Sequence, residues 1–157
     1  MKFRKGQSLV EFAVWIVVLL IILAGVVDVG RVLFTFISYR DASEEGAVYG
    51  ALFPTYCTQI EDRALSILGY PPTIQANIKI DNYTCAEVLE LTDGDPGDDP
   101  NFQSPACLGH TITVEVRDPH FEISMPFLGA FIGTNHFPLS ASVHNTIIRT
   151  PCSISSP

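Results

Sequence analysis

The chain begins with one long apolar stretch. Sixteen consecutive residues, Phe12 to Val27, carry no charge, which corresponds to about 24 Å of α-helix. A membrane core is roughly 30 Å thick, so Ser8 to Val10 and the turn after Val27 are needed to complete one crossing. No residue in the following segment breaks a helix until Pro54. The pattern predicts one transmembrane and stalk helix over residues 7–53, half of it beyond the bilayer.

After Pro54 the hydrophobic pattern changes twice. Thr58 and Glu61 form a capping box ahead of a short amphipathic segment that ends at Gly69. Apolar and polar residues then alternate in three stretches, 73–81, 112–116 and 139–143, as in strands with one buried face. We expect an α+β fold: the long helix, a short second helix, and a small antiparallel sheet of three to four strands packed on the stalk. Residues 54–157 are then one extracytoplasmic head.

The basic residues at the start orient this arrangement. Lys2, Arg4 and Lys5 precede the apolar stretch, and the positive-inside rule places such an N-terminus in the cytoplasm and the head outside it. One residue is not expected in a helix that serves only to anchor the chain in a membrane. Glu11 lies within the apolar stretch, where a carboxylate costs roughly 2–4 kcal/mol unless it finds a partner. Glu11 is therefore a candidate functional residue.

Two further sets of residues on the long helix are candidate contacts. Asp28 and Arg31 are three residues apart and can pair at the membrane boundary, as a functional pair or as an ordinary interfacial ion pair. Ala42, Gly46 and Gly50 recur every four residues and form a smooth helix packing stripe. The stripe suits either the chain's own head or a neighbouring subunit, and the pattern does not decide between them.

Charge argues against one class of partner. The net charge is −8, and the only basic cluster is the N-terminal tip, so we expect no nucleic acid partner, because phosphate binding needs clustered Lys and Arg. The mean hydropathy of +0.28 owes much to the apolar stretch. In the outer half of the long helix, Arg40 can reach Glu44 one turn away.

All four cysteines follow the apolar stretch, on the side that the charge rule places outside the cytoplasm. Disulfides persist there, and no pair has the Cys-x-x-Cys spacing of a redox or zinc site. We expect two disulfides, with free thiols as the alternative. Among the three possible pairings we favour Cys85–Cys107, which closes an acidic connection, and Cys57–Cys152, which ties the C-terminus to the end of the long helix.

Two connections between the predicted elements have a distinctive composition. Residues 82–109 contain six acidic side chains and no basic one. Their core, 93–99, lacks the order of ligands of an EF-hand, which favours a solvated acidic loop over a calcium site. Residues 119–137 hold four phenylalanines, which suit either completion of a small core or a contact surface.

The usual signatures of catalysis are absent from the sequence. There is no Gly-x-Ser-x-Gly elbow, no phosphate-binding glycine loop and no His-Glu-x-x-His pair. The histidines at 110, 120, 136 and 144 are scattered over predicted strand and turn positions. We therefore expect no enzymatic activity, no bound metal and no cofactor.

The N-terminal motif resembles that of a known class. Gly6, four residues, and then Glu11-Phe12 ahead of an apolar helix are similar to the processing signature of type IV pilin-like precursors. Within that class the chain resembles the TadE-like minor pseudopilins, which share an Asp28-Val29-Gly30-Arg31 type of motif and a small-residue patch such as 42–51. The resemblance implies cleavage between Gly6 and Gln7 by a prepilin peptidase, with residues 1–6 as a leader peptide. It also implies that Glu11 meets the N-terminal amine of a neighbouring subunit.

The function implied by this resemblance is structural. The chain would be a minor pseudopilin of a Tad or type IV-like pilus or secretion apparatus, a single-pass protein of the cytoplasmic (inner) membrane. Its partners would be the membrane, a prepilin peptidase, other pilins and pseudopilins, and the pilus assembly platform. The alternatives are a single-span anchored protein, or a secreted disulfide-bonded binding domain behind a signal peptide of roughly 25–30 residues. Glu11 and the missing small-x-small site near Ala24 argue against the signal peptide.

Overall fold

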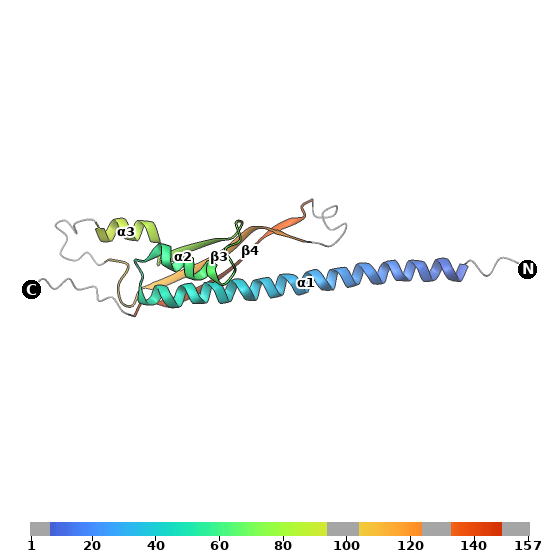
Figure 1. Ribbon diagram of the computed structural model, residues 1–157, viewed down its shortest axis with the longest axis horizontal. Coiled ribbons are helices and arrows are strands. Elements are labelled where there is room, and N and C mark those ends of the chain that lie inside the picture. The colour runs from blue at the N-terminus through green and yellow to red at the C-terminus, as the bar shows by residue number, and fades with distance from the viewer. Residues whose placement is uncertain (1–6, 94–103, 124–132, 149–157) are drawn as a thin grey trace, which may run out of the picture. The chain divides into compact units, whose positions relative to one another are not determined.

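The computed structural model describes residues 7–93, 104–123 and 133–148. This described part of the chain holds three helices and four strands (Figure 1). In chain order they are α1 (Gln7–Leu52), α2 (Cys57–Ser66), β1 (Gln75–Ile80), β2 (Tyr83–Thr84), α3 (Cys85–Asp93), β3 (Thr111–Glu122) and β4 (His136–Thr146). The α+β class expected from the sequence is confirmed.

The chain forms two compact units. The first unit comprises residues 1–35 and 121–137, and the second comprises residues 36–120 and 138–157. Helix α1 therefore contributes its N-terminal part to one unit and its C-terminal part to the other.

Helix α1 is a single unbroken helix of 46 residues, as the absence of helix-breaking residues predicts. It ends at Leu52, one residue before the expected end, and the Phe53 N–H still donates to the Tyr49 carbonyl oxygen at 3.0 Å. Pro54 follows at once and cannot continue the ladder of hydrogen bonds.

The start of α2 differs from the prediction. The N-cap is Tyr56, without a side-chain capping bond, so Thr58 lies inside the helix and the expected Thr58–Glu61 capping box is wrong. The first turn closes earlier, because the Ile60 N–H donates to the Tyr56 carbonyl oxygen at 3.0 Å. The buried side chains of α2 are Ile60 and Ala64, one turn apart on one face, as in the amphipathic segment that the sequence predicts.

The four strands form one antiparallel sheet in the order β2-β1-β3-β4. Ile78 of β1 faces Val114 of β3 across the ladder, and all three predicted alternating stretches are strands. The short strand β2 was not predicted. It follows β1 through a two-residue turn at Asp81 and Asn82, with Asp81 at φ 51°, a left-handed conformation that Asp and Asn tolerate better than most residues.

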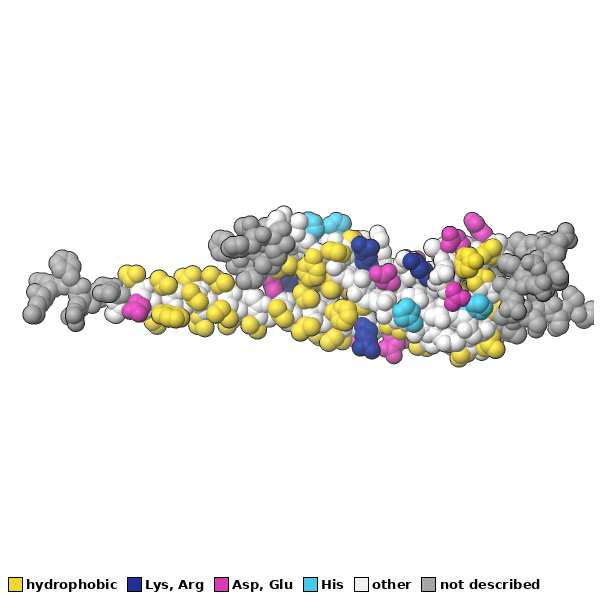
Figure 2. All heavy atoms as spheres, turned by 180° about the vertical axis from the view of Figure 1, so that it is seen from behind, with side chains coloured by type: hydrophobic (Ala, Val, Ile, Leu, Met, Phe, Trp, Pro, Cys, Tyr) yellow, Lys and Arg dark blue, Asp and Glu magenta, His cyan; other side chains and the backbone are white. Residues whose placement is uncertain are grey.

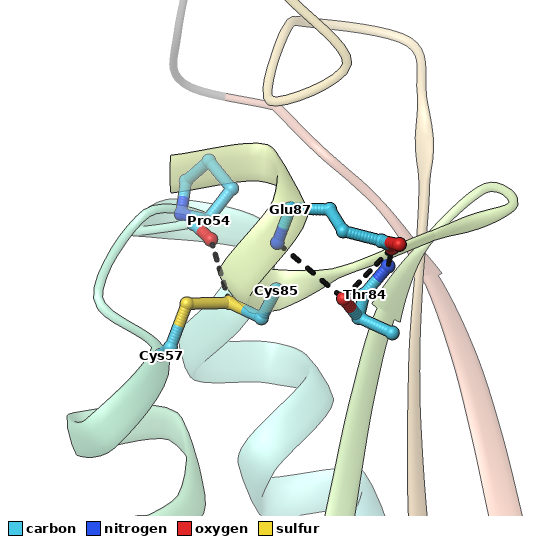
Figure 3. The surroundings of a disulfide bond; sticks show 5 residues. All are labelled: Pro54, Cys57, Thr84, Cys85 and Glu87. Atoms are coloured by element: carbon cyan, nitrogen blue, oxygen red, sulfur yellow. Dashed lines mark hydrogen bonds between the residues drawn. A yellow bond between two sulfur atoms is a disulfide. The ribbon is translucent and has the colours of Figure 1, made fainter. Parts of the chain in front are cut away.

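A second correction concerns residues 82–109, which we interpreted as one acidic connection. Its first part forms β2 and α3, and a capping box begins α3. The Thr84 N–H donates to Glu87 Oε2 at 2.7 Å, and the Glu87 N–H donates back to Thr84 Oγ1 at 3.4 Å (Figure 3). The hydrogen bond from the Thr84 backbone lowers the pKa of the Glu87 carboxyl.

Within the second unit, two polar side chains join α1 to the sheet. The Ser43 hydroxyl lies 3.0 Å from the Ala141 carbonyl oxygen of β4 and 2.9 Å from the Tyr39 carbonyl oxygen one turn earlier. The phenol of Tyr39 donates to the Asp118 carboxylate of β3 at 3.3 Å, and both side chains are buried. Because buried polar groups tolerate few alternative partners, these bonds fix how α1 lies on the sheet.

In the first unit, described aromatic side chains meet near the end of β3 and the start of β4. The rings of Phe121 and Phe137 pack edge to face at 5.4 Å, and the Arg31 guanidinium lies 6.0 Å from the centre of the Phe121 ring. The other phenylalanines of the segment 119–137 lie outside the described residues. Phe121 is buried, which agrees with the core interpretation for that residue.

Because of Tyr39, we expect the second unit to lose stability at alkaline pH. Its side chain is 3 % exposed, and burial, assisted by the Asp118 charge, raises the pKa of the phenol to about 12. A raised pKa in the folded state means that the protonated phenol stabilises the fold fully below pH of about 10, and that this contribution is lost as the pH rises towards 12.

We expect Tyr39→Phe to lower the free energy of unfolding by about 1–2 kcal/mol at pH 7, because the hydrogen bond to Asp118 is lost. The variant should also show a shallower loss of stability between pH 10 and 12. Urea unfolding at several pH values measures both effects. Tyr56→Phe, at an exposed tyrosine, is the matched control, and equal pH profiles for the wild type and Tyr39→Phe would contradict the assignment.

Candidate functional site

The N-terminal half of α1 exposes an almost continuous apolar surface. The large apolar side chains from Leu9 to Val27 are exposed, for example Trp15 at 67 %. Figure 2 shows hydrophobic side chains covering this part of the helix on the face drawn. By length and composition, α1 is able to cross a membrane, and its most apolar window is not buried within the protein. The surface therefore needs a bilayer or partner helices to cover it.

Glu11 interrupts this surface near its start. Its side chain is exposed, as is that of Phe12 beside it. Gln7 is the first residue of α1, whereas Gly6 lies outside the described residues. The expected cleavage point thus falls directly before the first helical residue.

Asp28 and Arg31 pair, as their spacing predicts. The Arg31 Nη1 lies 3.6 Å from Asp28 Oδ1. Asp28 is only 8 % exposed, whereas the Arg31 side chain is about half exposed and also lies over the Phe121 ring. Arg31 thus links a buried carboxylate to an aromatic side chain within the first unit.

The stripe of small residues packs on the chain itself. Ala42, Gly46 and Gly50 are all buried. A Cβ added at Gly46 would lie 3.1 Å from both Ala64 of α2 and Val114 of β3. Of the two roles that the pattern left open, the structure shows the internal one, since α2 and β3 already occupy this face.

Sequence reasoning did not identify Tyr39, Ser43 and Asp118 as the polar contacts of this face. A signal was present, because Tyr39 and Ser43 lie one turn apart on the helix row beside the stripe, the row that continues through Ala47 and Ala51. Asp118 stands in an alternating strand at a position that faces inward.

Gly50 has no room for a side chain. A Cβ there would meet Ile112 of β3 and lie 3.3 Å from Ile60 of α2. We expect Gly50→Leu to lower the free energy of unfolding by about 1–3 kcal/mol, because overpacking forces the core apart. Denaturant unfolding in detergent measures this.

Gly30→Leu is the matched control, because a Cβ at Gly30 meets no described atom within 4 Å. Equal destabilisation by the two substitutions would mean that the effect at Gly50 comes from helix propensity or detergent binding and not from packing.

The cysteine pairing predicted from the sequence is wrong. Cys57 at the start of α2 is bonded to Cys85 at the start of α3, with a Cα–Cα distance of 5.9 Å (Figure 3). This excludes both Cys85–Cys107 and Cys57–Cys152. The bond spans 28 residues and contributes about 2–4 kcal/mol by restricting the unfolded chain. Cys85 Sγ lies 3.8 Å from the Pro54 carbonyl oxygen, so the bond holds β2 and α3 against the end of α1.

The expectation that the cysteines are oxidised holds for Cys107 as well, which is disulfide-bonded. Cys152 lies outside the described residues.

The other candidate sites are a possible metal site and the described histidines. The described residues contain no group of three His, Cys, Asp or Glu side chains placed to hold a metal ion, and residues 94–99 of the acidic segment lie outside the described part. His110 bonds to the Asp81 carboxylate, which also accepts the Thr111 N–H at 3.0 Å. The bond to His110 lowers the pKa of Asp81, and it ties the β1–β2 turn to the start of β3.

These features define a class of protein with one long apolar helix, exposed over its N-terminal half and packed on a disulfide-bonded α+β unit over its C-terminal half. The family model described as TadE-like protein matches residues 6–48. The match covers the motif from Gly6 to Phe12, the apolar stretch and most of the small-residue stripe, and it confirms the TadE-like resemblance seen in the sequence. No curated protein and no solved structure shows significant similarity to the chain.

Proposed function

We propose that the chain is a minor pseudopilin, a structural subunit of a Tad or type IV-like pilus or secretion apparatus. The observation that carries this proposal is the exposed apolar half of α1 with Glu11 near its start, in a segment that matches the TadE-like family model. A helix of this kind can be embedded in a bilayer and later pack among other helices without refolding. The disulfide-bonded unit remains attached to it throughout.

The proposal includes processing and orientation. A prepilin peptidase removes residues 1–6, and the mature chain begins at Gln7 in the cytoplasmic (inner) membrane. Before cleavage, the basic tip orients the precursor with this end in the cytoplasm. The pair Asp28–Arg31 then lies at the other boundary of the same membrane. The partners are other pilins and pseudopilins and the assembly platform. In the assembled state, Glu11 pairs with the N-terminal amine of a neighbouring subunit, which compensates a carboxylate that is costly in an apolar environment.

The N-terminal mass of the protein recovered from its native membrane tests the processing step. We expect the wild-type chain to begin at Gln7 and the Gly6→Ala variant to keep its leader, because the residue before the cut is replaced. A chain that begins beyond Ala24 would indicate a secretory signal peptide instead. An intact Met1 in the wild type would indicate a permanently anchored protein.

Substitution of Glu11 tests the assembly step separately from processing. We expect Glu11→Ala to insert into the membrane normally, since it removes a charge from an apolar segment, but to enter the filament fraction at a level reduced by about tenfold, comparable to the loss of one desolvated charge contact. Glu61→Ala, at an exposed acidic residue of α2, is the matched control. Wild-type incorporation of Glu11→Ala would refute the pairing role.

A further inference from the structure

The sulfur of Cys107 has a partner that is not among the other described cysteines. The sequence holds four cysteines, at positions 57, 85, 107 and 152. Cys57 and Cys85 are bonded to each other, and Cys107 is disulfide-bonded as well. Cys152 is the one remaining cysteine of the sequence and lies outside the described residues. The number of cysteines therefore leaves a single candidate partner for Cys107 within the chain.

The chain that precedes β3 lies beside the chain that follows β4. The Gly109 N–H donates to the Ile147 carbonyl oxygen at 3.0 Å, and the Ile147 N–H donates to the His110 carbonyl oxygen at 2.9 Å. Because Cys107 is only two residues before Gly109, it lies within roughly 13 Å of Ile147. Cys152 follows Ile147 by five residues, which extend to about 18 Å at most. Cys152 can therefore reach Cys107 without any movement of the described residues.

Cys107 lies in a buried part of the second unit. Its side chain is 4 % exposed, and Ala106 beside it is 5 % exposed. The Cys107 carbonyl oxygen accepts a hydrogen bond from the His110 N–H at 3.2 Å, and the Ser104 hydroxyl oxygen accepts one from the Ala106 N–H at 3.3 Å. A bond to Cys107 therefore joins its partner to a segment that already packs in the core.

The chain beyond β4 makes two contacts that depend on its position. Strand β4 ends at Thr146, and the next side chain, Ile147, is fully buried. The Ile148 N–H then donates to the Ala51 carbonyl oxygen at 3.1 Å. Ala51 lies in the last turn of α1, where carbonyl oxygens have no partner within the helix. A bond that holds the chain after Ile148 protects both contacts, because segments beyond the last strand otherwise open easily.

We propose that Cys107 and Cys152 form a second disulfide, which fastens the chain beyond β4 beside the end of α1. The first disulfide reaches the same end of the helix through Cys85, whose Sγ lies 3.8 Å from the Pro54 carbonyl oxygen (Figure 3). Together the two bonds tie α3 and the chain beyond β4 to the point where α1 ends. The proposal shares with the proposed function only the location of the second unit outside the cytoplasm, where disulfides persist.

Formation of this bond is a two-electron oxidation. The thiols of Cys107 and Cys152 lose two protons and two electrons, and a disulfide of an external oxidant takes these up and leaves as two thiols. The pair Cys57–Cys85 and the pair Cys107–Cys152 each join cysteines that are consecutive in the chain, so the two loops do not interleave. No cysteine has to exchange a first partner for a second one, and a dithiol–disulfide oxidant is therefore sufficient.

Peptide mapping of the full-length chain from its native membrane tests the pairing. Free thiols are blocked with an alkylating agent in denaturant, the protein is digested without reduction, and the linked peptides are identified by mass spectrometry. We expect one linked pair that contains Cys57 and Cys85, another that contains Cys107 and Cys152, and no alkylated cysteine. The double variant Cys57→Ser with Cys85→Ser is the matched control, which should lose the first linked pair and keep the second.

The first disulfide makes the two possible failures distinguishable. Alkylated Cys107 and Cys152 beside an intact Cys57–Cys85 pair would disprove the second bond alone. A covalent dimer on a non-reducing gel, with Cys107 linked to another copy or to a different protein, would also overturn the proposal. Alkylation of all four cysteines would contradict the location of the second unit outside the cytoplasm, and the proposed function and the second bond would then fail together.

Amide hydrogen exchange of the full-length chain in detergent tests whether the bond fastens the chain beyond β4. We expect Cys152→Ser to speed exchange at Ile147 and Ile148 by about tenfold, because local opening is no longer restricted by the cross-link. Cys107→Ser should give the same change. The peptide that contains Val114 of β3 is the internal control and should exchange as in the wild type. Unchanged exchange at Ile148 in both variants would refute the fastening role even where the bond is present.

Discussion

The need to keep the first half of α1 out of water governs the rest of the structure. Each large apolar side chain gains about 1.5–3 kcal/mol on burial, and those between Leu9 and Val27 are left exposed by the part of the chain that the structure describes. Burying this surface therefore needs lipid or other helices. Glu11 is the one charged group in this stretch, which makes its carboxylate the costliest group to place in an apolar environment.

Beyond the apolar half, the same helix becomes a structural support with two different sides. The buried side uses small residues for close approach and two polar bonds, from Tyr39 and Ser43, for a defined orientation. The other side keeps apolar and charged residues in contact with solvent. A helix that packs on its own sheet with one side leaves the other side exposed, so attachment of the α+β unit does not use the whole surface of the helix.

The long helix and three strands were predictable because a 3.6-residue or two-residue period extends over many positions, and local errors average out. The rest depended on short signals. The capping box of α3, Thr84 and Glu87, was present in the sequence but lay inside a segment whose many carboxylates suggested a loop. The pairing of Cys57 with Cys85 depends on where the turn after β1 returns the chain, and that is set by tertiary contacts which spacing does not contain.

The bond between Ser43 and Ala141 joins residues 98 positions apart in the chain. One partner lies on the first element and the other on the last described strand, so the polar side of α1 is satisfied only after nearly the whole polypeptide has been made. Contacts of such long range are slow to form, because the intervening loop must close first. During synthesis, therefore, α1 is complete long before β4 exists, and its polar side gains these bonds only at the end.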